Sequence, residues 1–334
     1  MNKRTVKIGF ADFWGSYEPT EGYIYRTLSK KYNITIDNDD PDFLFFSTYG
    51  CDHLDYKKAV KIFFTHENVF PNFNLCDYSL SFLRDGIGGR NLYLPVALLF
   101  DKHNIPPFDT CLLNRRFCNF IYSQESIGGG ARLRKQVCQE LMKYRLVDCP
   151  GRVLHNMDAL ELSDRKQGDW NATKINFLKN YKFTIAFENT NTDGYITEKL
   201  IDPLLAGSVP IYWGSAGNVF PFSKDCMIYA NDYHDIDSLI ARIKEVDEND
   251  ELYMSICNAN PIRNGALVSL EETFLKFFDK IYEAGPVPLL KDELKRDTVA
   301  HVLNSTCVRK AYNFNKWYQK QTALQKFIGL LRRK

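Results

Sequence analysis

Residues 181–214, YKFTIAFENTNTDGYITEKLIDPLLAGSVPIYWG, decide the fold predicted for this 334-residue chain. The apolar run at 183–187 is followed by a polar loop, a helical segment that starts near Thr197, and a second apolar run at 209–213. This alternation predicts a strand, a loop, a helix and a second strand. A crossover of this length favours a parallel sheet, and open parallel sheets bind ligands beyond the carboxyl ends of their strands. We therefore expect a ligand site in the loop at 188–198.

The start of the predicted helix has the chemistry of an anion site. Thr197 is a candidate N-cap, so Glu198 and Lys199 fall in the first turn, where backbone N–H groups and the helix dipole favour negative charge. Lys199 adds a positive charge, and a carboxylate such as that of Glu198 can accept hydrogen bonds from a ribose diol. Phosphate and ribose together indicate a nucleotide. The alternative is that Glu198 and Lys199 are ordinary solvated residues of a helix.

The triplet FEN, followed by GYITEK and VPIYWG, closely resembles the nucleotide-binding motif of the bacterial α-1,3/4-fucosyltransferases of glycosyltransferase family 10, which build Lewis-type antigens. The resemblance assigns contacts with GDP-fucose to Asn189, Tyr195, Glu198 and Lys199. It implies that Glu198 binds the ribose and that Lys199 binds the diphosphate. Pro203 departs from a continuous helix and should shorten or kink it, without moving the first turn.

Residues 65–82, THENVFPNFNLCDYSLSF, follow an expected strand at 61–65 and resemble a second segment of the same family. In that segment a GEN-like triplet precedes PNFNL, and its glutamate is assigned as the catalytic base. The resemblance places this role on Glu67, for which the alternative is a solvated loop acid. His66 stands where the bacterial relatives have glycine, so its imidazole could crowd or tune the carboxylate.

Three glycines at 128–130 lead into an expected helix that carries Arg132 and Arg134. Glycines and a guanidinium suit a diphosphate, and the family has a phosphate-binding arginine in this helix. The glycines leave the register open. Aligned backward from Leu141 the residue is Arg134, and aligned forward from Ser123 it falls nearer Arg132. We favour Arg134, and a solvated helix face is the alternative for the other arginine.

The composition is that of a soluble globular enzyme without an evident metal site. The first 15 residues lack the long apolar run of a signal peptide, and no stretch approaches the roughly 18 apolar residues of a spanning helix. Nine irregularly spaced cysteines and six scattered histidines favour reduced core residues over disulfides or metal ligands. Asp40 and Asp42 form a DxD pattern, but the intervening proline favours a turn. A second such pair, Asp235 and Asp237, is most simply a helix cap.

The C-terminal tail, residues 307–334, has eight Lys or Arg and no acidic residue. The whole chain carries +2, which leaves −6 for the rest, so nucleic acid is a poor partner for the body of the protein. Apolar residues in the tail recur near helical spacing, which predicts a basic amphipathic helix on an anionic membrane surface. The alternatives are a partner-binding helix and a solvated face. We therefore expect a cytoplasmic protein, peripheral on the inner face of a bacterial cytoplasmic membrane.

Strand and helix alternation by itself supports an α/β fold, and the resemblance implies the GT-B type, with two Rossmann-like domains facing across a cleft. We expect an acceptor-side domain at 1–155, a GDP-fucose domain at 156–306 and the basic helix at 307–334. The passage between the two domains is expected at 148–174, where Pro, Gly and charged residues surround one short apolar run.

The resemblance implies an inverting α-1,3-fucosyltransferase that moves fucose from GDP-β-L-fucose to the GlcNAc of a galactosyl-GlcNAc acceptor by direct displacement. Glu67 would remove the proton of the acceptor hydroxyl, and Glu198 would help to stabilise positive charge on the sugar. Lys199, Arg134 and the helix N-terminus would stabilise the leaving diphosphate, so we expect no requirement for a metal or another cofactor. The alternatives are an α-1,4 or dual-specificity enzyme, a transferase for another sugar nucleotide, and a non-catalytic, membrane-associated sugar-nucleotide-binding protein.

Overall fold

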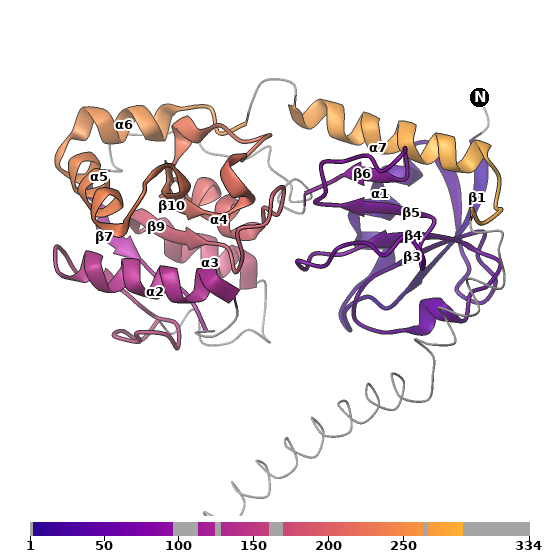
Figure 1. Ribbon diagram of the computed structural model, residues 1–334, viewed down its shortest axis with the longest axis horizontal. Coiled ribbons are helices and arrows are strands. Elements are labelled where there is room, and N and C mark those ends of the chain that lie inside the picture. Colours follow the sequence, from indigo (N-terminus) through magenta and orange to yellow (C-terminus); the bar gives the residue numbers. More distant parts are fainter. Residues whose placement is uncertain (1–2, 96–112, 124–127, 160–169, 263–265, 290–334) are drawn as a thin grey trace, which may run out of the picture. The chain divides into compact units, whose positions relative to one another are not determined.

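The structure, a computed structural model, describes residues 3–95, 113–123, 128–159, 170–262 and 266–289. The chain forms two compact units. Unit 1 contains Met1–Leu80 together with the described residues from Leu275 onward, and unit 2 contains Ser81–Phe274. Figure 1 shows a β-sheet in each part, with helices packed on the strands. The expected α/β class is confirmed.

The first sheet has the strand order β2-β1-β3-β4-β5-β6. Its strands are β1 (Arg4–Ala11), β2 (Tyr32–Ile36), β3 (Phe43–Phe46), β4 (Val60–Phe64), β5 (Tyr78–Ser81) and β6 (Asn91–Tyr93). Every strand pair whose register is described is parallel. Helix α1 (Tyr23–Ser29) connects β1 to β2, and it ends just before the chain enters β2 at Tyr32.

The second sheet repeats this arrangement, with the order β11-β10-β9-β7-β8. Its strands are β7 (Arg116–Asn119), β8 (Val147–Asp148), β9 (Tyr181–Phe187), β10 (Val209–Trp213) and β11 (Ile228–Tyr229), and all described pairs are parallel. In both sheets the first strand lies between the second and the third. The strand order therefore reverses between β1 and β3 and between β7 and β9, and such switch points are where open parallel sheets bind ligands.

Helices cover both faces of the second sheet. They are α2 (Gly128–Met142), α3 (Trp170–Leu178), α4 (Glu198–Ala206), α5 (Ile236–Glu248) and α6 (Asp250–Asn258). Side chains alternate between the faces along β9. Phe183 and Ile185 pack in the core that contains α2, α5 and α6, whereas Ala186 packs with α4. The predicted strand, loop, helix and strand at 181–214 is confirmed as β9, α4 and β10.

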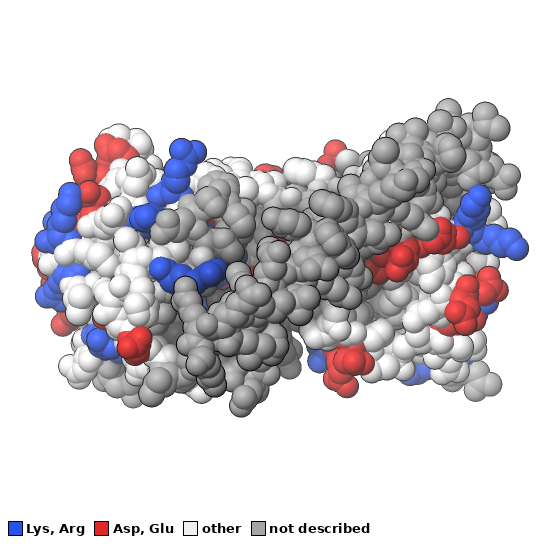
Figure 2. All heavy atoms as spheres, turned by 90° about the horizontal axis from the view of Figure 1, so that it is seen from below, with Lys and Arg blue, Asp and Glu red and all other residues white. Residues whose placement is uncertain are grey.

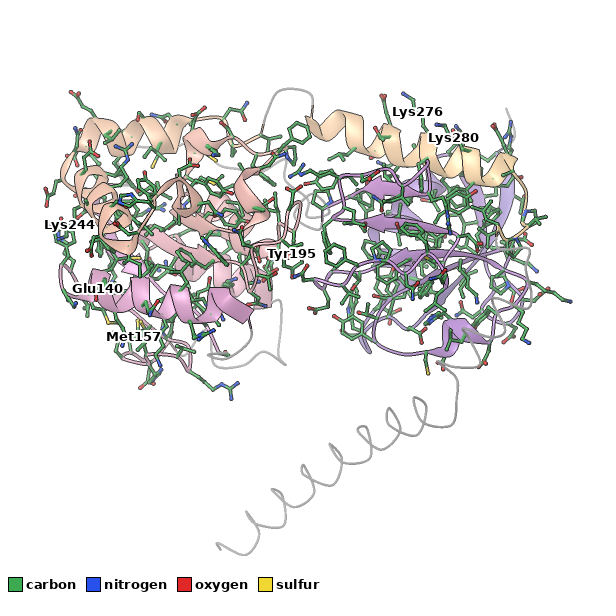
Figure 3. The ribbon with its side chains drawn as sticks, viewed as in Figure 1. Glu140, Met157, Tyr195, Lys244, Lys276 and Lys280 are labelled. Carbon is green, nitrogen blue, oxygen red and sulfur yellow. The ribbon has the colours of Figure 1, made fainter. Side chains whose placement is uncertain are left out.

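Helix α7 (Ala266–Glu283) covers part of the first sheet. Phe278 is fully buried and meets the ring of Phe43 of β3 edge-on, with centroids 5.4 Å apart. Lys276 and Lys280 of the same helix are exposed and point away from the strands (Figure 3). The helix therefore turns its apolar face toward the sheet.

The expected domain boundary near residue 155 is wrong. Strand β7 pairs with β9, and β8 pairs with β7, so both belong to the second sheet although they precede this boundary. The expected interdomain passage at 148–174 accordingly lies inside unit 2, and the chain returns to unit 1 at Leu275. A short apolar run predicts a strand but carries no sign of which sheet it will join, because that depends on partners far away in sequence.

The described surface carries charges of both signs. On the face drawn in Figure 2, basic and acidic side chains both occur, with uncharged residues between them. Within the described ranges, no helix combines the length and the apolar character needed to cross a bilayer. The basic tail at 307–334 lies outside the described residues, so its membrane contact stays a prediction.

Candidate active site

A cavity of about 430 Å³ lies in unit 2 at the switch point between β7 and β9. Its walls come from these two strands, their loops and helices α2, α3 and α4. Among the described residues, its charged lining has three basic and two acidic side chains, which are Arg134, Lys174, Lys199, Glu198 and Asp202. The excess of positive charge suits an anionic ligand such as a diphosphate.

A buried carboxylate holds the loop between β9 and α4. Glu188 has no exposed surface and accepts hydrogen bonds from the Thr197 N–H at 2.8 Å and from its hydroxyl at 2.9 Å. The Thr197 hydroxyl in turn accepts the N–H of Lys199 at 3.4 Å, which confirms the predicted N-cap. Burial raises the pKa of Glu188. Sequence reasoning missed Glu188, although its place directly after a fully buried strand was a signal.

Lys199 lies between two carboxylates. Its ammonium is 3.4 Å from Oε2 of Glu188 and 3.2 Å from Oε1 of Glu198. Burial alone would lower the pKa of Lys199, but these carboxylates outweigh it and raise the pKa. Burial opposes ionisation of Glu198 too, but Lys199 and Lys174 outweigh it and lower the pKa of Glu198 to about 2. At neutral pH Glu198 is therefore a hydrogen-bond acceptor, as a contact with a ribose diol requires.

Arg134 and Arg132 point in different directions. The Arg134 side chain is buried, with its guanidinium 3.9 Å from the ring centroid of Tyr122, and it donates a hydrogen bond to Oδ1 of Asn189 at 2.9 Å. Arg132 is exposed. Between the two candidates, Arg134 is the one that lines the cavity.

The glycines before Arg134 serve helix packing. A Cβ atom at Gly130 would lie 2.1 Å from the carbonyl oxygen of Glu188, so only glycine lets α2 approach the loop after β9 this closely. The N–H of Gly130 donates to the carbonyl of Asn189 at 3.1 Å. The same contact brings Arg134, one turn further along α2, to the cavity.

A second ion pair, unexpected from the sequence, joins α3 to α4. Lys174 donates to Oδ2 of Asp202 at 2.8 Å. Burial raises the pKa of Asp202, and Lys174 opposes this rise. Helix α4 runs without a break through Pro203 and ends at Gly207, whose φ of 65° requires the left-handed conformation that glycine adopts most easily. The helix therefore does not end at Pro203, and its first turn keeps the predicted position.

Tyr195 does not line this cavity. Its side chain is buried, and its ring meets that of Phe82 edge-on at 5.5 Å. Gly194 has a φ of 76°, and a Cβ atom there would lie 2.0 Å from the carbonyl oxygen of Phe82. The structure thus brings Asn189, Glu198 and Lys199 together with Arg134, and the donor contact of Tyr195 stays a prediction.

Glu67 lies in unit 1, in the loop after β4. Its carboxylate is exposed, and Oε1 accepts the hydroxyl of Tyr49 at 2.9 Å. The ring of His66 packs against Trp14, with centroids 4.9 Å apart, and against Phe64 at 5.2 Å. The imidazole is thus part of an aromatic cluster beside the predicted base.

Neither DxD pattern forms part of a metal site in the described structure. Asp40 pairs with Lys7 at 3.1 Å in the turn that enters β3, and Asp235 caps α5 by accepting the N–H of Ser238 at 2.7 Å. The predicted turn before β3 and the predicted helix cap at Asp235 are confirmed. Throughout the described ranges, no three His, Cys, Asp or Glu side chains are grouped to hold a metal ion, and the seven cysteines there form no disulfide.

The second sheet, with an electropositive cavity at its switch point and a helix N-terminus carrying Glu198 and Lys199, has the arrangement that nucleotide-binding α/β folds share. Residues 8–100 match the alpha-(1,3)-fucosyltransferase FucT N-terminal domain, and residues 121–258 match the C-terminal domain of glycosyltransferase family 10 (fucosyltransferase). The chain belongs to glycosyltransferase family 10, as predicted from its motifs.

Individual relatives extend this result. The chain is 28% identical over 304 residues to the alpha-(1,3)-fucosyltransferase FucT of Helicobacter pylori. This match covers 77% of this chain and 60% of the Helicobacter pylori protein. It is 34% identical over 148 residues to alpha-(1,3)-fucosyltransferase B of Drosophila melanogaster, covering 40% and 32%. It is 40% identical over 123 residues to GDP-fucose protein O-fucosyltransferase 3 of Xenopus tropicalis, covering 36% and 26%. The chain therefore spans less than two thirds of each of these relatives.

Solved structures agree with the family. A crystal structure of an α1,3-fucosyltransferase with GDP has a TM-score of 0.68 and 25% sequence identity, and covers 84% of this chain and 91% of that one. The structure of an α1,3-fucosyltransferase with GDP-fucose gives the same values. The two parallel sheets described above are thus close to those of a GT-B fucosyltransferase.

Proposed function

We propose that this protein is an inverting α-1,3-fucosyltransferase, which transfers L-fucose from GDP-β-L-fucose to the 3-hydroxyl of GlcNAc in a galactosyl-GlcNAc acceptor. One observation carries the proposal. Three residues of the family's donor motif, Asn189, Glu198 and Lys199, meet Arg134 at one electropositive cavity. Arg134 comes from a separate part of the chain, 55 residues before Asn189, and its convergence with the motif is what a nucleotide diphosphate requires.

The donor would lie along the N-terminus of α4. Lys199 and Arg134 would pair with the diphosphate oxygens, with help from the backbone N–H groups of the first turn. The ionised carboxylate of Glu198 would accept hydrogen bonds from the ribose diol. Because charge develops on the diphosphate as it leaves, these cations stabilise the transition state more than the ground state.

The transfer would be a single displacement. The acceptor oxygen attacks the anomeric carbon of fucose, the bond from that carbon to the diphosphate oxygen breaks, and its electron pair leaves with GDP. Glu67 would take the proton of the acceptor hydroxyl, and Glu198 would help to stabilise positive charge on the sugar. The cations of the cavity would stabilise the negative charge of the leaving diphosphate, as a metal ion does in other transferases. We therefore propose that the enzyme is active without a divalent ion or another cofactor.

The acceptor and the location are the finer parts of the proposal. An α-1,4 or dual specificity would use the same donor site. A protein acceptor is the second candidate, because the Xenopus relative that matches part of the chain is a protein O-fucosyltransferase by name. A cytoplasmic location, with residues 307–334 on an anionic membrane surface, rests on the charge pattern of the tail alone.

The test is release of GDP from GDP-fucose in EDTA, with N-acetyllactosamine, its β1,3-linked isomer and lactose compared. We expect release that depends on acceptor and is fastest with N-acetyllactosamine. Preference for the β1,3-linked isomer would favour the α-1,4 linkage. If GDP-fucose binds but none of the three acceptors causes release of GDP, the proposal is contradicted. That result would favour another acceptor or a non-catalytic binding protein.

A further inference from the structure

The loops at the switch point of the first sheet surround Glu67. Strands β1 and β3 are neighbours, and the chain leaves them in loops that begin at Asp12 and Ser47. Glu67 follows the next strand, β4. The carboxyl ends of parallel strands meet at one edge of a sheet, so all three loops lie at the edge where ligands bind.

Asp12 anchors the loop after β3. Its φ of 59° is in the left-handed region, which is costly for a residue other than glycine, and its carboxylate is buried. The carboxylate accepts the N–H groups of Asp52 at 2.8 Å and His53 at 3.0 Å, and it lies 2.6 Å from Nδ1 of His53. Burial alone would raise the pKa of Asp12, but these hydrogen bonds outweigh it and lower the pKa.

This anchor also holds Tyr49. The carbonyl of Asp12 accepts the N–H of Tyr49 at 2.9 Å. A Cβ atom at the next residue, Gly50, would lie 2.2 Å from Oδ1 of Asp12, so glycine is needed for the loop to close on the carboxylate. The ring of Trp14 meets that of Tyr49 edge-on at 6.1 Å. The backbone and the ring of Tyr49 are therefore both held in place.

The hydroxyl of Tyr49 reaches the carboxylate of Glu67. It donates to Oε1 at 2.9 Å. Burial and the carboxylate of Glu67 raise the pKa of Tyr49 to about 12, so the hydroxyl remains a donor at neutral pH. Within the described part of the chain, Oε2 of Glu67 has no hydrogen-bond partner, and the side chain is exposed. One oxygen of the carboxylate is thus held by Tyr49, while the other accepts no hydrogen bond from the residues that the structure describes.

We propose that Tyr49 is a positioning residue, which holds Glu67 so that Oε2 accepts the proton of the acceptor hydroxyl. This inference rests on the proposed role of Glu67 as base. An exposed glutamate on a loop samples several rotamers, and a general base acts only when its oxygen is within hydrogen-bond reach of the proton. A third group that orients the base is the usual solution in catalytic sites, and Asp12 makes the position of Tyr49 rigid.

The test compares Tyr49→Phe with Tyr56→Phe in the full-length protein. Tyr56 also lies in unit 1, and its hydroxyl donates to the main-chain carbonyl of Asn38 at 2.6 Å, so the control removes the same atom from a bond that does not involve the base. The rate constants are measured with GDP-fucose and N-acetyllactosamine, and thermal unfolding is followed for both variants. We expect Tyr49→Phe to lower kcat about 10- to 100-fold, the worth of one hydrogen bond to a charged group, with KM for both substrates within about twofold.

Three results would overturn the inference. One is a kcat for Tyr49→Phe close to that of the wild type. Another is an unchanged kcat with a raised KM for N-acetyllactosamine, since Tyr49 would then bind the acceptor. The third is an equal loss in both variants, which would indicate a structural effect. Glu67→Gln is measured alongside. Wild-type turnover in that variant would show that Glu67 is not the base, which would contradict the proposed function as well as the positioning role of Tyr49.

Discussion

Replacing Lys199 with methionine should both destabilise the fold and weaken GDP binding. Methionine keeps most of the side-chain stem, so the change removes mainly the ammonium. The ammonium is 3.4 Å from Oε2 of Glu188, a residue with no exposed surface. Removing one partner of a buried pair costs about 3–5 kcal/mol, because the other charge is left buried without compensation. Glu188 keeps its hydrogen bonds from Thr197, so we expect the lower end, about 3 kcal/mol at pH 7.

The pH dependence gives a second test of the same reasoning. Burial raises the pKa of Glu188, so the folded protein binds this proton more tightly than the unfolded chain does. Stability contributed by this residue is therefore lost as pH rises above about 4.3, the value expected in the unfolded chain. Without Lys199 this loss should grow, because nothing then offsets the buried negative charge. The destabilisation caused by Lys199→Met should be largest at neutral pH and smaller near pH 5.

The assays are urea unfolding at two pH values and calorimetric titration with GDP. Binding of GDP should weaken about 10- to 100-fold, the loss expected for one charged hydrogen bond. The double variant Glu188→Gln with Lys199→Met should recover most of the lost stability, but not the GDP affinity. A free energy of unfolding at pH 7 equal to that of the wild type, or a double variant no more stable than Lys199→Met, would refute the argument.

Three further predictions concern single substitutions, and two of them have a matched control. Glu67→Gln should lower kcat about 10²- to 10⁴-fold without changing the dissociation constant of GDP, and unchanged turnover would remove it as the base. Arg134→Ala should weaken GDP binding, measured by calorimetry, whereas Arg132→Ala, on the exposed face, should not; equal effects would contradict the placement of the cavity. Gly130→Ala should cost about 1–3 kcal/mol in urea unfolding, because its Cβ would meet the Glu188 carbonyl at 2.1 Å. Gly129→Ala, with open space around its Cβ, should be neutral or stabilising, and similar results for the two glycines would disprove the packing argument.

Local features of the site were predictable from sequence. The N-cap at Thr197 and the first-turn positions of Glu198 and Lys199 depend on residues within one helical turn, so their pattern is visible in a short stretch. The resemblance to a known family added Glu67 and the arginine of α2. The tertiary structure was needed to show that Arg134 is buried and lines the cavity, whereas Arg132 is exposed.

Features that depend on distant partners were missed. Lys174 was expected in a linker between domains, yet it lies on a helix and pairs with Asp202 of α4. Glu188 accepts a hydrogen bond from Thr197 at the N-terminus of α4, nine residues further along the chain. This contact forms only because the loop between β9 and α4 folds back on the end of the strand. The contact of Tyr49 with Glu67 was not predicted, because no pattern near Tyr49 in the sequence indicates this hydrogen bond.

The sequence by itself determined the alternation of strands and helices, the caps and turns, and the family to which the chain belongs. These follow from periodicity and from contacts between near neighbours. Only the tertiary structure decided which sheet each strand joins and which charges meet at the cavity. Both depend on pairings between segments far apart in the chain. Thus β7 lies beside β9, and Arg134 meets Asn189, although 55 residues separate the two side chains.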